Sequence, residues 1–112
     1  MYETKLDTSA LAWSPTGASG ISVKILHQNE STGGMTGMTR LAPGSSIAAH
    51  SHTQADQTVF VLEGDLIDNG VSYGPGSFFV VKAGSPHGPH STSGGCILLT
   101  TYSGPPDFVP AG

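Results

Sequence analysis

The sequence predicts an all-β protein, an antiparallel jelly-roll barrel made of two packed sheets. Its apolar residues form roughly seven or eight short runs, separated by turns about every eight to twelve residues. No segment shows the 3.6-residue apolar period of an amphipathic helix. The 16 glycines and 8 prolines among 112 residues fit many turns between short strands. We therefore expect one domain over 1–112, with an N-terminal arm at 1–20, a barrel at 21–103 and an irregular tail at 104–112.

The first half of the predicted barrel begins after the arm. Ile21–Leu26 alternates apolar and polar residues and is expected to form a strand. Gln28–Gly34 is a polar turn, and Met35–Leu41 is the next strand. Pro43-Gly44 ends that strand, because proline and glycine favour turns over a continued ladder. A third strand is expected at Ile47–His52.

The second half starts with a long strand at Gln57–Ile67, which is rich in β-branched residues and is interrupted at Gly64. Asn69-Gly70 predicts a tight hairpin, because both central residues of that turn need positive φ. Val71–Tyr73 forms the returning strand. Two further strands complete the prediction. They are Ser77–Lys82 and Gly95–Tyr102.

Charge and cysteine content exclude several classes of partner. Four basic and eight acidic residues give a formal charge of −4, without a Lys/Arg cluster that would bind nucleic acid. Cys96 is the single cysteine, so no intramolecular disulfide forms, which fits a reducing compartment. The N-terminal residues lack the order of a signal peptide, and no apolar run approaches about 18 residues. We expect a cytoplasmic protein that binds neither nucleic acid nor membrane.

His50, His52 and His87 form a candidate metal site. On a strand, residues i and i+2 point to the same face about 6.5 to 7 Å apart, so His50 and His52 can converge on one ion. Zinc–imidazole bonds are about 2.0 to 2.1 Å long. A closed antiparallel sheet would bring His87 to the other two from a distant part of the chain.

The spacing around the first two histidines resembles the first motif of the cupins. Gly44 is followed by His50 and His52, then Gln57 and Gly64. In the family, a glutamate commonly occupies the position of Gln57.

The residues around the third histidine resemble the second cupin motif. Gly76, Gly84 and His87 occupy their expected positions. Lys82 replaces the proline of the motif, and Ser91 replaces its asparagine.

Within the RmlC-like cupins, the chain looks most similar to diketone-cleaving dioxygenases and to the cupin half of zinc-binding anti-sigma factors. The similarity rests on Arg40–Gly44, Val61–Leu66, Tyr73–Ser77 and Gly84–Ser91. It implies a jelly roll, a homodimer, and a divalent metal held by three histidines with the residue at the glutamate position. Some diketone-cleaving relatives bind iron through three histidines alone, so loss of the glutamate does not exclude catalysis.

Gln57 therefore completes the expected ligand set of His50, His52 and His87. Glutamine keeps an oxygen donor but carries no charge, so it is a weaker ligand for a hard cation. Four neutral ligands leave the charge of the ion uncompensated, which favours an anionic ligand such as an enolate. Asp56 offers a carboxylate one position earlier, although alternation should point it to the opposite face. A bond from Gln57, from Asp56 or from neither remains open.

Strand parity and position also give expectations for other side chains near the motifs. Val59 and Val61 share the parity of Gln57, so they should face inward and make the cavity apolar. Arg40 could face the cavity or solvent. His90 is an additional ligand, a proton shuttle or a surface residue, and we expect it on the surface.

These features predict a metal-dependent, dioxygenase-type oxidoreductase that acts on a small dicarbonyl or enolisable substrate. Fe(II) is favoured, while zinc, nickel, manganese and copper also suit imidazole or oxygen ligands. One alternative is a non-catalytic module that binds or senses a metal or small ligand. Another is a cupin isomerase or lyase for a sugar-like or carboxylate substrate, which would need a titratable group such as Asp56 or His90.

Overall fold

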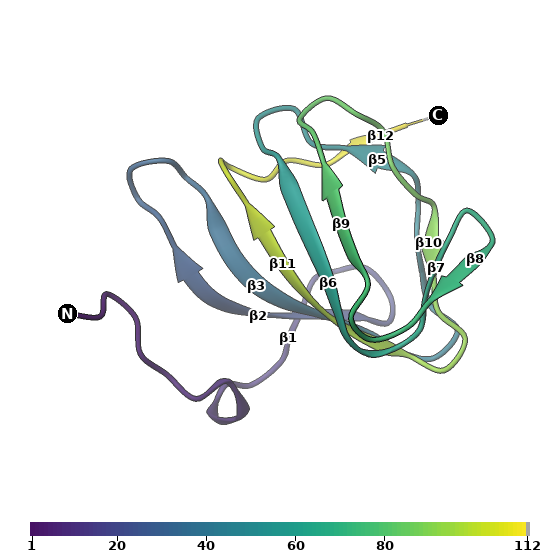
Figure 1. The fold of residues 1–112 in the computed structure, drawn as a ribbon, viewed down its shortest axis with the longest axis horizontal. Coiled ribbons are helices and arrows are strands. Elements are labelled where there is room, and N and C mark those ends of the chain that lie inside the picture. The colour runs from purple at the N-terminus through teal and green to yellow at the C-terminus, as the bar shows by residue number, and fades with distance from the viewer. Residues whose placement is uncertain (112) are drawn as a thin grey trace.

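The computed structural model describes residues 1–111 and has the predicted jelly-roll arrangement of antiparallel sheets (Figure 1). One sheet has six strands, in the spatial order β1 (Ser14–Pro15), β2 (Ile21–Gln28), β3 (Met35–Leu41), β11 (Cys96–Tyr102), β6 (Gln57–Gly64) and β9 (Phe78–Val81). The facing sheet has four, in the order β4 (Ser46–Ile47), β10 (His90–Ser91), β7 (Leu66–Asp68) and β8 (Val71–Tyr73). A third sheet pairs β12 (Val109–Pro110) with β5 (His50–Ser51) at one end of the barrel.

Strand β6 shows how side-chain alternation builds the interior. Gln57, Val59 and Val61 are buried, whereas Phe60 on the opposite face is 38% exposed. The inward direction predicted for the two valines is therefore confirmed. Since β6 lies between β11 and β9, its inner face looks across the barrel toward the four-stranded sheet.

The hydrophobic core lies between the two large sheets and reaches the end of the barrel away from β5. Leu41 at the end of β3 pairs with Cys96 at the start of β11, which in turn pairs with Gly64 at the end of β6. The buried core cluster comprises Leu41, Val59, Val61, Leu66, Cys96 and Leu98. At the opposite ends of β6 and β11, Gln57 pairs with Tyr102. The candidate functional site lies at that end of the barrel.

The hairpin predicted at Asn69-Gly70 is confirmed. Asn69 has φ 52° and Gly70 has φ 82°, the left-handed values that this turn requires. The turn joins β7 to β8, with Asp68 paired to Val71.

Two expectations about strands were wrong. The expected strand at Ile47–His52 is split into β4 and β5, because β4 pairs with β10 whereas β5 pairs with β12. The tail expected to be irregular contributes β12 to that second pair. Residue 112, the last residue of the expected tail, lies outside the described residues.

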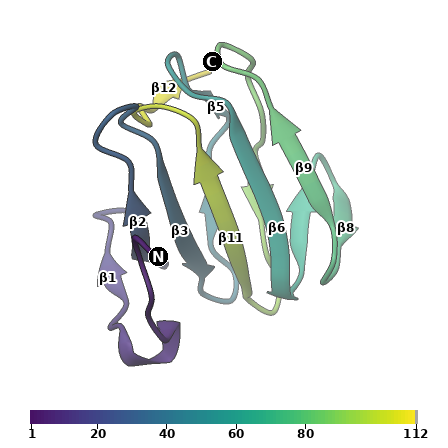
Figure 2. The same ribbon diagram turned by 60° about the vertical axis from the view of Figure 1, so that its left-hand side comes forward.

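The N-terminal arm runs beside β2 and extends away from the barrel (Figure 2). It contains a short 3-10 helix, η1 (Thr8–Ala10), whose carbonyl at Thr8 accepts a hydrogen bond of 2.9 Å from the buried Lys24 ammonium. The centroid of the Trp13 ring lies 4.7 Å from Lys24 Nζ and 4.6 Å from Arg40 Cζ. Because the adjacent Thr39 lines the cavity, alternation places Arg40 on the outer face of the sheet.

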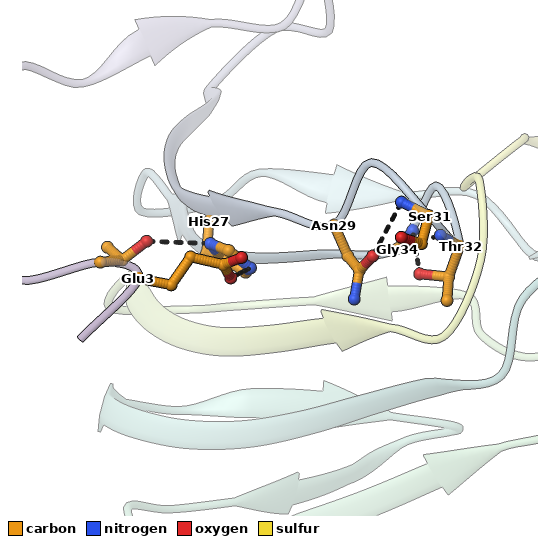
Figure 3. A network of polar contacts seen from close by, with 7 residues as sticks. Glu3, His27, Asn29, Ser31, Thr32 and Gly34 are labelled. Carbon is orange, nitrogen blue, oxygen red and sulfur yellow. Dashed lines mark hydrogen bonds and ion pairs between the residues drawn. The ribbon is translucent and has the colours of Figure 1, made fainter. Parts of the chain in front are cut away.

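His27 ties the start of the arm to the end of β2 (Figure 3). Its Nε2 lies 3.0 Å from a Glu3 carboxylate oxygen, and its Nδ1 lies 2.9 Å from Thr4 Oγ1. Beyond β2, the side chain of Asn29 accepts hydrogen bonds from the backbone of Ser31 and Thr32, which stabilises the turn to β3.

No helix within 1–111 has the length and apolar character needed to cross a bilayer.

Candidate metal centre

Three histidine side chains meet at the end of the barrel where β5 lies. His50 is on β5, His52 follows it, and His87 precedes β10. One ring nitrogen of each lies within 4.8 Å of those of the other two. Two bonds of about 2.1 Å to one ion span at most about 4.2 Å, so small ring rotations would let all three nitrogens bind the same ion. The structure thus brings together the three histidines that the sequence predicts.

The main chain holds His87 against β5. His50 N donates to the His87 carbonyl at 3.0 Å, and His87 N donates to the His50 carbonyl at 2.8 Å. In such an antiparallel pair, directly opposed side chains lie on the same side of the ladder. The backbone therefore places these two rings together without help from an ion.

Two of the rings are oriented through Nδ1. His50 Nδ1 lies 2.7 Å from the Ala48 carbonyl oxygen, and His52 Nδ1 is hydrogen-bonded to the Asp107 carbonyl oxygen. A carbonyl oxygen only accepts, so each Nδ1 carries the proton and each Nε2 keeps a free lone pair. Metal-binding histidines commonly make this kind of second hydrogen bond.

Three buried polar atoms here have no hydrogen-bond partner in the described part of the chain: His52 Nε2, His87 Nδ1 and Gln57 Oε1. Buried polar atoms are nearly always paired, so their presence together needs a physical reason. Imidazole nitrogen and amide oxygen are both metal donors. The donor set therefore fits a divalent ion.

Gln57 and Asp56 point to different sides, as alternation predicts. Gln57 is buried on the cavity wall, and its Nε2 donates to Tyr102 Oη at 3.1 Å, which leaves Oε1 free. Asp56 is exposed, and its Oδ1 accepts a hydrogen bond of 2.9 Å from Ala83 N. Asp56 therefore serves a loop contact and does not reach the histidines.

Burial favours the neutral form of His50 and His87. Desolvation, followed by the neighbouring His50, lowers the pKa of His87 from 6.5 to about 4. Desolvation also lowers the pKa of His50 below its ordinary value. Because only neutral imidazole binds a metal, both rings are available to an ion at neutral pH.

The histidines open onto a cavity of about 440 Å³ between the two sheets. Its apolar walls come from both sheets and from the segments at each end of the chain. They include Ala18, Ile21, Val23, Ile47, Val59, Leu66, Leu98 and Phe108. A cavity with a cluster of polar donors at one wall suits a small, mostly apolar ligand that has one polar end.

His90 is on the cavity wall, so the expectation that it lies on the surface was wrong. His90 is on strand β10, which lies between β4 and β7. The preceding Pro89 interrupts strand alternation, so the sequence does not predict the direction of the His90 side chain. His90 Nε2 lies 3.0 Å from Asp68 Oδ1. Desolvation lowers the pKa of His90, although the Asp68 carboxylate opposes that shift.

Two aromatic residues of the site were not predicted. Phe108 stacks on His50, with ring centroids 4.3 Å apart and an interplanar angle of 22°. Tyr102 meets His52 edge-on, with centroids 5.3 Å apart. Tyr102 shares the strand parity of the inward-facing Leu98 and Thr100, so alternation could have identified it. The tail around Phe108 carries no comparable periodic signal.

Known structures share this fold across nearly the whole chain. A Methylibium petroleiphilum PM1 protein proposed to be an acetylacetone dioxygenase is 22% identical, with a TM-score of 0.84 over 100% of this chain and 88% of its own. An acetylacetone dioxygenase from Acinetobacter johnsonii is also 22% identical, with a TM-score of 0.76 over 96% of this chain and 77% of its own.

The complex of Rhodobacter sphaeroides SigE with the anti-sigma ChrR contains a further match. It is 20% identical, with a TM-score of 0.69 over 85% of this chain and 51% of the matched chain. No curated protein matches the sequence. The profile of the ChrR cupin-like domain family matches residues 2–105. Because the matched residues make up nearly the whole chain, the chain belongs to the ChrR cupin-like domain family.

Proposed function

We propose that the protein is a metal-dependent, dioxygenase-type oxidoreductase acting on a small dicarbonyl or otherwise enolisable compound. The observation that carries this proposal is the meeting of three histidines at the wall of an apolar cavity. The neutral donor set leaves the charge of a divalent ion uncompensated, so the site favours an anionic ligand such as an enolate.

In this proposal His50, His52 and His87 hold the ion, with Gln57 Oε1 as the fourth protein ligand. Fe(II) is the proposed metal. When bound, it supplies Lewis acidity toward the enolate and redox chemistry toward dioxygen. The chain itself orients the imidazoles and presents apolar side chains such as Val59 to the substrate.

Two structural neighbours support the choice of substrate class, because both are named for acetylacetone. The cavity of about 440 Å³ is large enough for a ligand of that kind. A β-diketone is therefore the first compound to test.

The decisive experiment is oxygen uptake by protein loaded anaerobically with Fe(II) and mixed with a β-diketone panel. We expect uptake in proportion to substrate, and its loss in His52→Ala. His27→Ala is the matched control, because His27 contacts the N-terminal arm and is remote from the cavity walls. Absence of uptake with every substrate and metal would contradict the proposed reaction.

A binding or sensing role is the second candidate. It is favoured by the family match and by the likeness to a chain in the SigE–ChrR complex. In that case metals or small ligands would raise the melting temperature without turnover, because binding to the native state alone stabilises it. Thermal-shift screening beside the oxygen assay separates the two functions.

We also propose that residues 1–112 act as one cytoplasmic cupin domain that forms a homodimer. Four apolar side chains support the dimer, since they lie on the outer face of the adjacent strands β6 and β9. They are Phe60, Leu62, Phe78 and Val80, with exposed fractions of 38%, 37%, 60% and 60%. Such a patch on a monomer is typical of an interaction site.

A further inference from the structure

We propose that residues 107–110, here called the strap, position His50 and His52 for metal binding. This inference rests on the metal-dependent function proposed above. It assigns a role to a segment that follows the last long strand of the barrel.

The strap supports β5 from one side. Val109 pairs with Ser51 and Pro110 pairs with His50. The other edge of β5 is bridged by His87. Because β5 belongs to neither of the two larger sheets, these two neighbours hold its backbone in place.

The strap also fixes the ring of His52. The Asp107 carbonyl accepts the Nδ1 proton of His52. The Asp107 carboxylate accepts two hydrogen bonds from Thr53, the residue that follows His52. Its Oδ1 lies 2.7 Å from Thr53 N, and its Oδ2 accepts from Thr53 Oγ1. The main chain of Asp107 thus binds His52, and its side chain binds Thr53. With Nδ1 bonded to the strap, His52 Nε2 points away from the strap.

Phe108 completes the support by covering His50. The nearly parallel stack, at 4.3 Å and 22°, occupies one face of the imidazole and restricts its rotation. Phe108 lines the cavity as well, yet it remains 54% exposed. An aromatic side chain that exposed contributes little to the core, so its contact with His50 is the main consequence of its position.

Groups that orient metal ligands typically change metal affinity by about 10- to 100-fold when removed. The test uses Zn(II) as the probe, with its dissociation constant measured by competition with a chelating dye. Asp107→Ala should weaken Zn(II) binding by about tenfold or more. Asp107→Asn should lose less, because it keeps an acceptor oxygen for Thr53 N. Phe108→Ala should also weaken binding.

Phe78→Ala is the matched control, because Phe78 has a similar exposed fraction of 60% but lies on the outer face of β9. It should bind Zn(II) like the parent. A second measurement is long-range ¹H–¹⁵N NMR of metal-free protein. We expect His52 in the Nδ1–H tautomer in the parent. Asp107→Ala keeps the main-chain carbonyl that accepts this proton but loses the carboxylate hydrogen bonds to Thr53 that hold the carbonyl in place, so we expect a mixture of tautomers.

Parent-like affinity and parent-like tautomers in Asp107→Ala and Phe108→Ala would overturn the strap proposal. Equal weakening in Phe78→Ala would also overturn it, as would failure of the parent to bind Zn(II). A parent that binds Zn(II) tightly, responds to the strap variants and consumes no oxygen would instead reject the proposed reaction and leave the strap intact.

Discussion

Gln57 has two opposing effects at the scale of a single residue. Its buried Oε1 has no hydrogen-bond partner among the described residues, which costs stability in the metal-free protein. The same atom is the proposed fourth donor of the histidine site. A side chain that is unfavourable for folding and favourable for binding is typical of functional sites.

We predict that Gln57→Leu weakens Zn(II) binding while leaving the stability of the metal-free protein within about 1 kcal/mol of the parent. Leucine keeps the volume of the side chain and removes the unpaired oxygen, which offsets the loss of the hydrogen bond from Gln57 Nε2 to Tyr102 Oη. Gln57→Glu should bind Zn(II) more tightly than the parent, because it adds a negative charge. Urea unfolding and Zn(II) titration measure the two effects, and a parallel loss of both in Gln57→Leu would contradict this account.

The pKa of His87, lowered to about 4 by burial and by His50, predicts a pH dependence of stability in metal-free protein. Between pH 6.5 and 4 the unfolded chain takes up a proton at this position while the folded chain does not. The free energy of unfolding should therefore fall as the pH drops through this window. The lowered pKa of Asp7, Asp65 and Asp107 affects stability only at lower pH, below the ordinary carboxylate value.

Urea unfolding at pH 6.5 and pH 4.5, in the presence of a chelator, checks this prediction. His87→Asn should lose less stability than the parent between the two pH values, because it lacks the group that titrates. Identical losses in parent and variant would show that His87 is not held neutral by its surroundings.

At the scale of elements, the junction of β6 and β7 depends on Gly64. Its φ is +79°, and a Cβ there would clash with the Gly95 carbonyl oxygen and lie 2.8 Å from Cys96 Cα. Backbone atoms cannot move aside as a flexible side chain can. The sheet therefore closes at this point only with glycine.

We predict that Gly64→Ala lowers the free energy of unfolding by more than about 3 kcal/mol. Gly70→Ala is the matched control, because Gly70 has a similar φ of +82° but a Cβ added there would meet no atom within 4 Å. It should cost only about 1–2 kcal/mol, from the left-handed conformation alone. Equal losses in the two variants, measured by urea unfolding, would refute the steric argument.

Local signals account for the elements that could be predicted from the sequence. Alternation gave the inner face of β6, and Asn69-Gly70 marked the turn between β7 and β8. The break after Ile47 could not be predicted, because it arises when the backbone changes its pairing partner from β10 to β12. Such pairing depends on residues far away in the chain.

The same distinction applies to the site. The spacing of His50, His52 and His87 sufficed to predict their convergence, since cupin motifs place these residues in register. The contact of Phe108 with His50 could not be predicted, because a proline-rich tail has no periodicity that reports its direction. Similarly, the inward position of His90 follows from the pairing of β10 with β7 and not from its neighbours in sequence.

At the scale of the whole molecule, the histidines lie at one end of the barrel and the core extends from the cavity toward the other end. The apolar patch of Phe60, Leu62, Phe78 and Val80 lies on the outer face of the six-stranded sheet. A dimer formed through that face would leave the cavity in each subunit intact. The side chains of β6 that line the cavity, Gln57 and Val59, point inward, whereas Phe60 and Leu62 point to the outer face. Assembly and metal binding should therefore be separable.

We predict that the parent protein is a dimer in solution and that Phe78→Asp with Val80→Asp is a monomer. Two like charges on neighbouring positions of β9 would have to be buried against their symmetry mates, which is unfavourable. Light scattering coupled to size-exclusion chromatography measures the mass. A parent that is monomeric at all concentrations, or a variant that remains dimeric, would contradict the proposed interface.

The late position of the strap has a consequence for protein synthesis. A nascent chain that has emerged from the ribosome as far as residue 100 already contains all three imidazoles, but it lacks the carbonyl of Asp107 and the ring of Phe108. The three site imidazoles are thus synthesised before the segment that orients two of them. In the proposed function, an ion would therefore meet a fully oriented site only once residues 107 and 108 have been added to the chain.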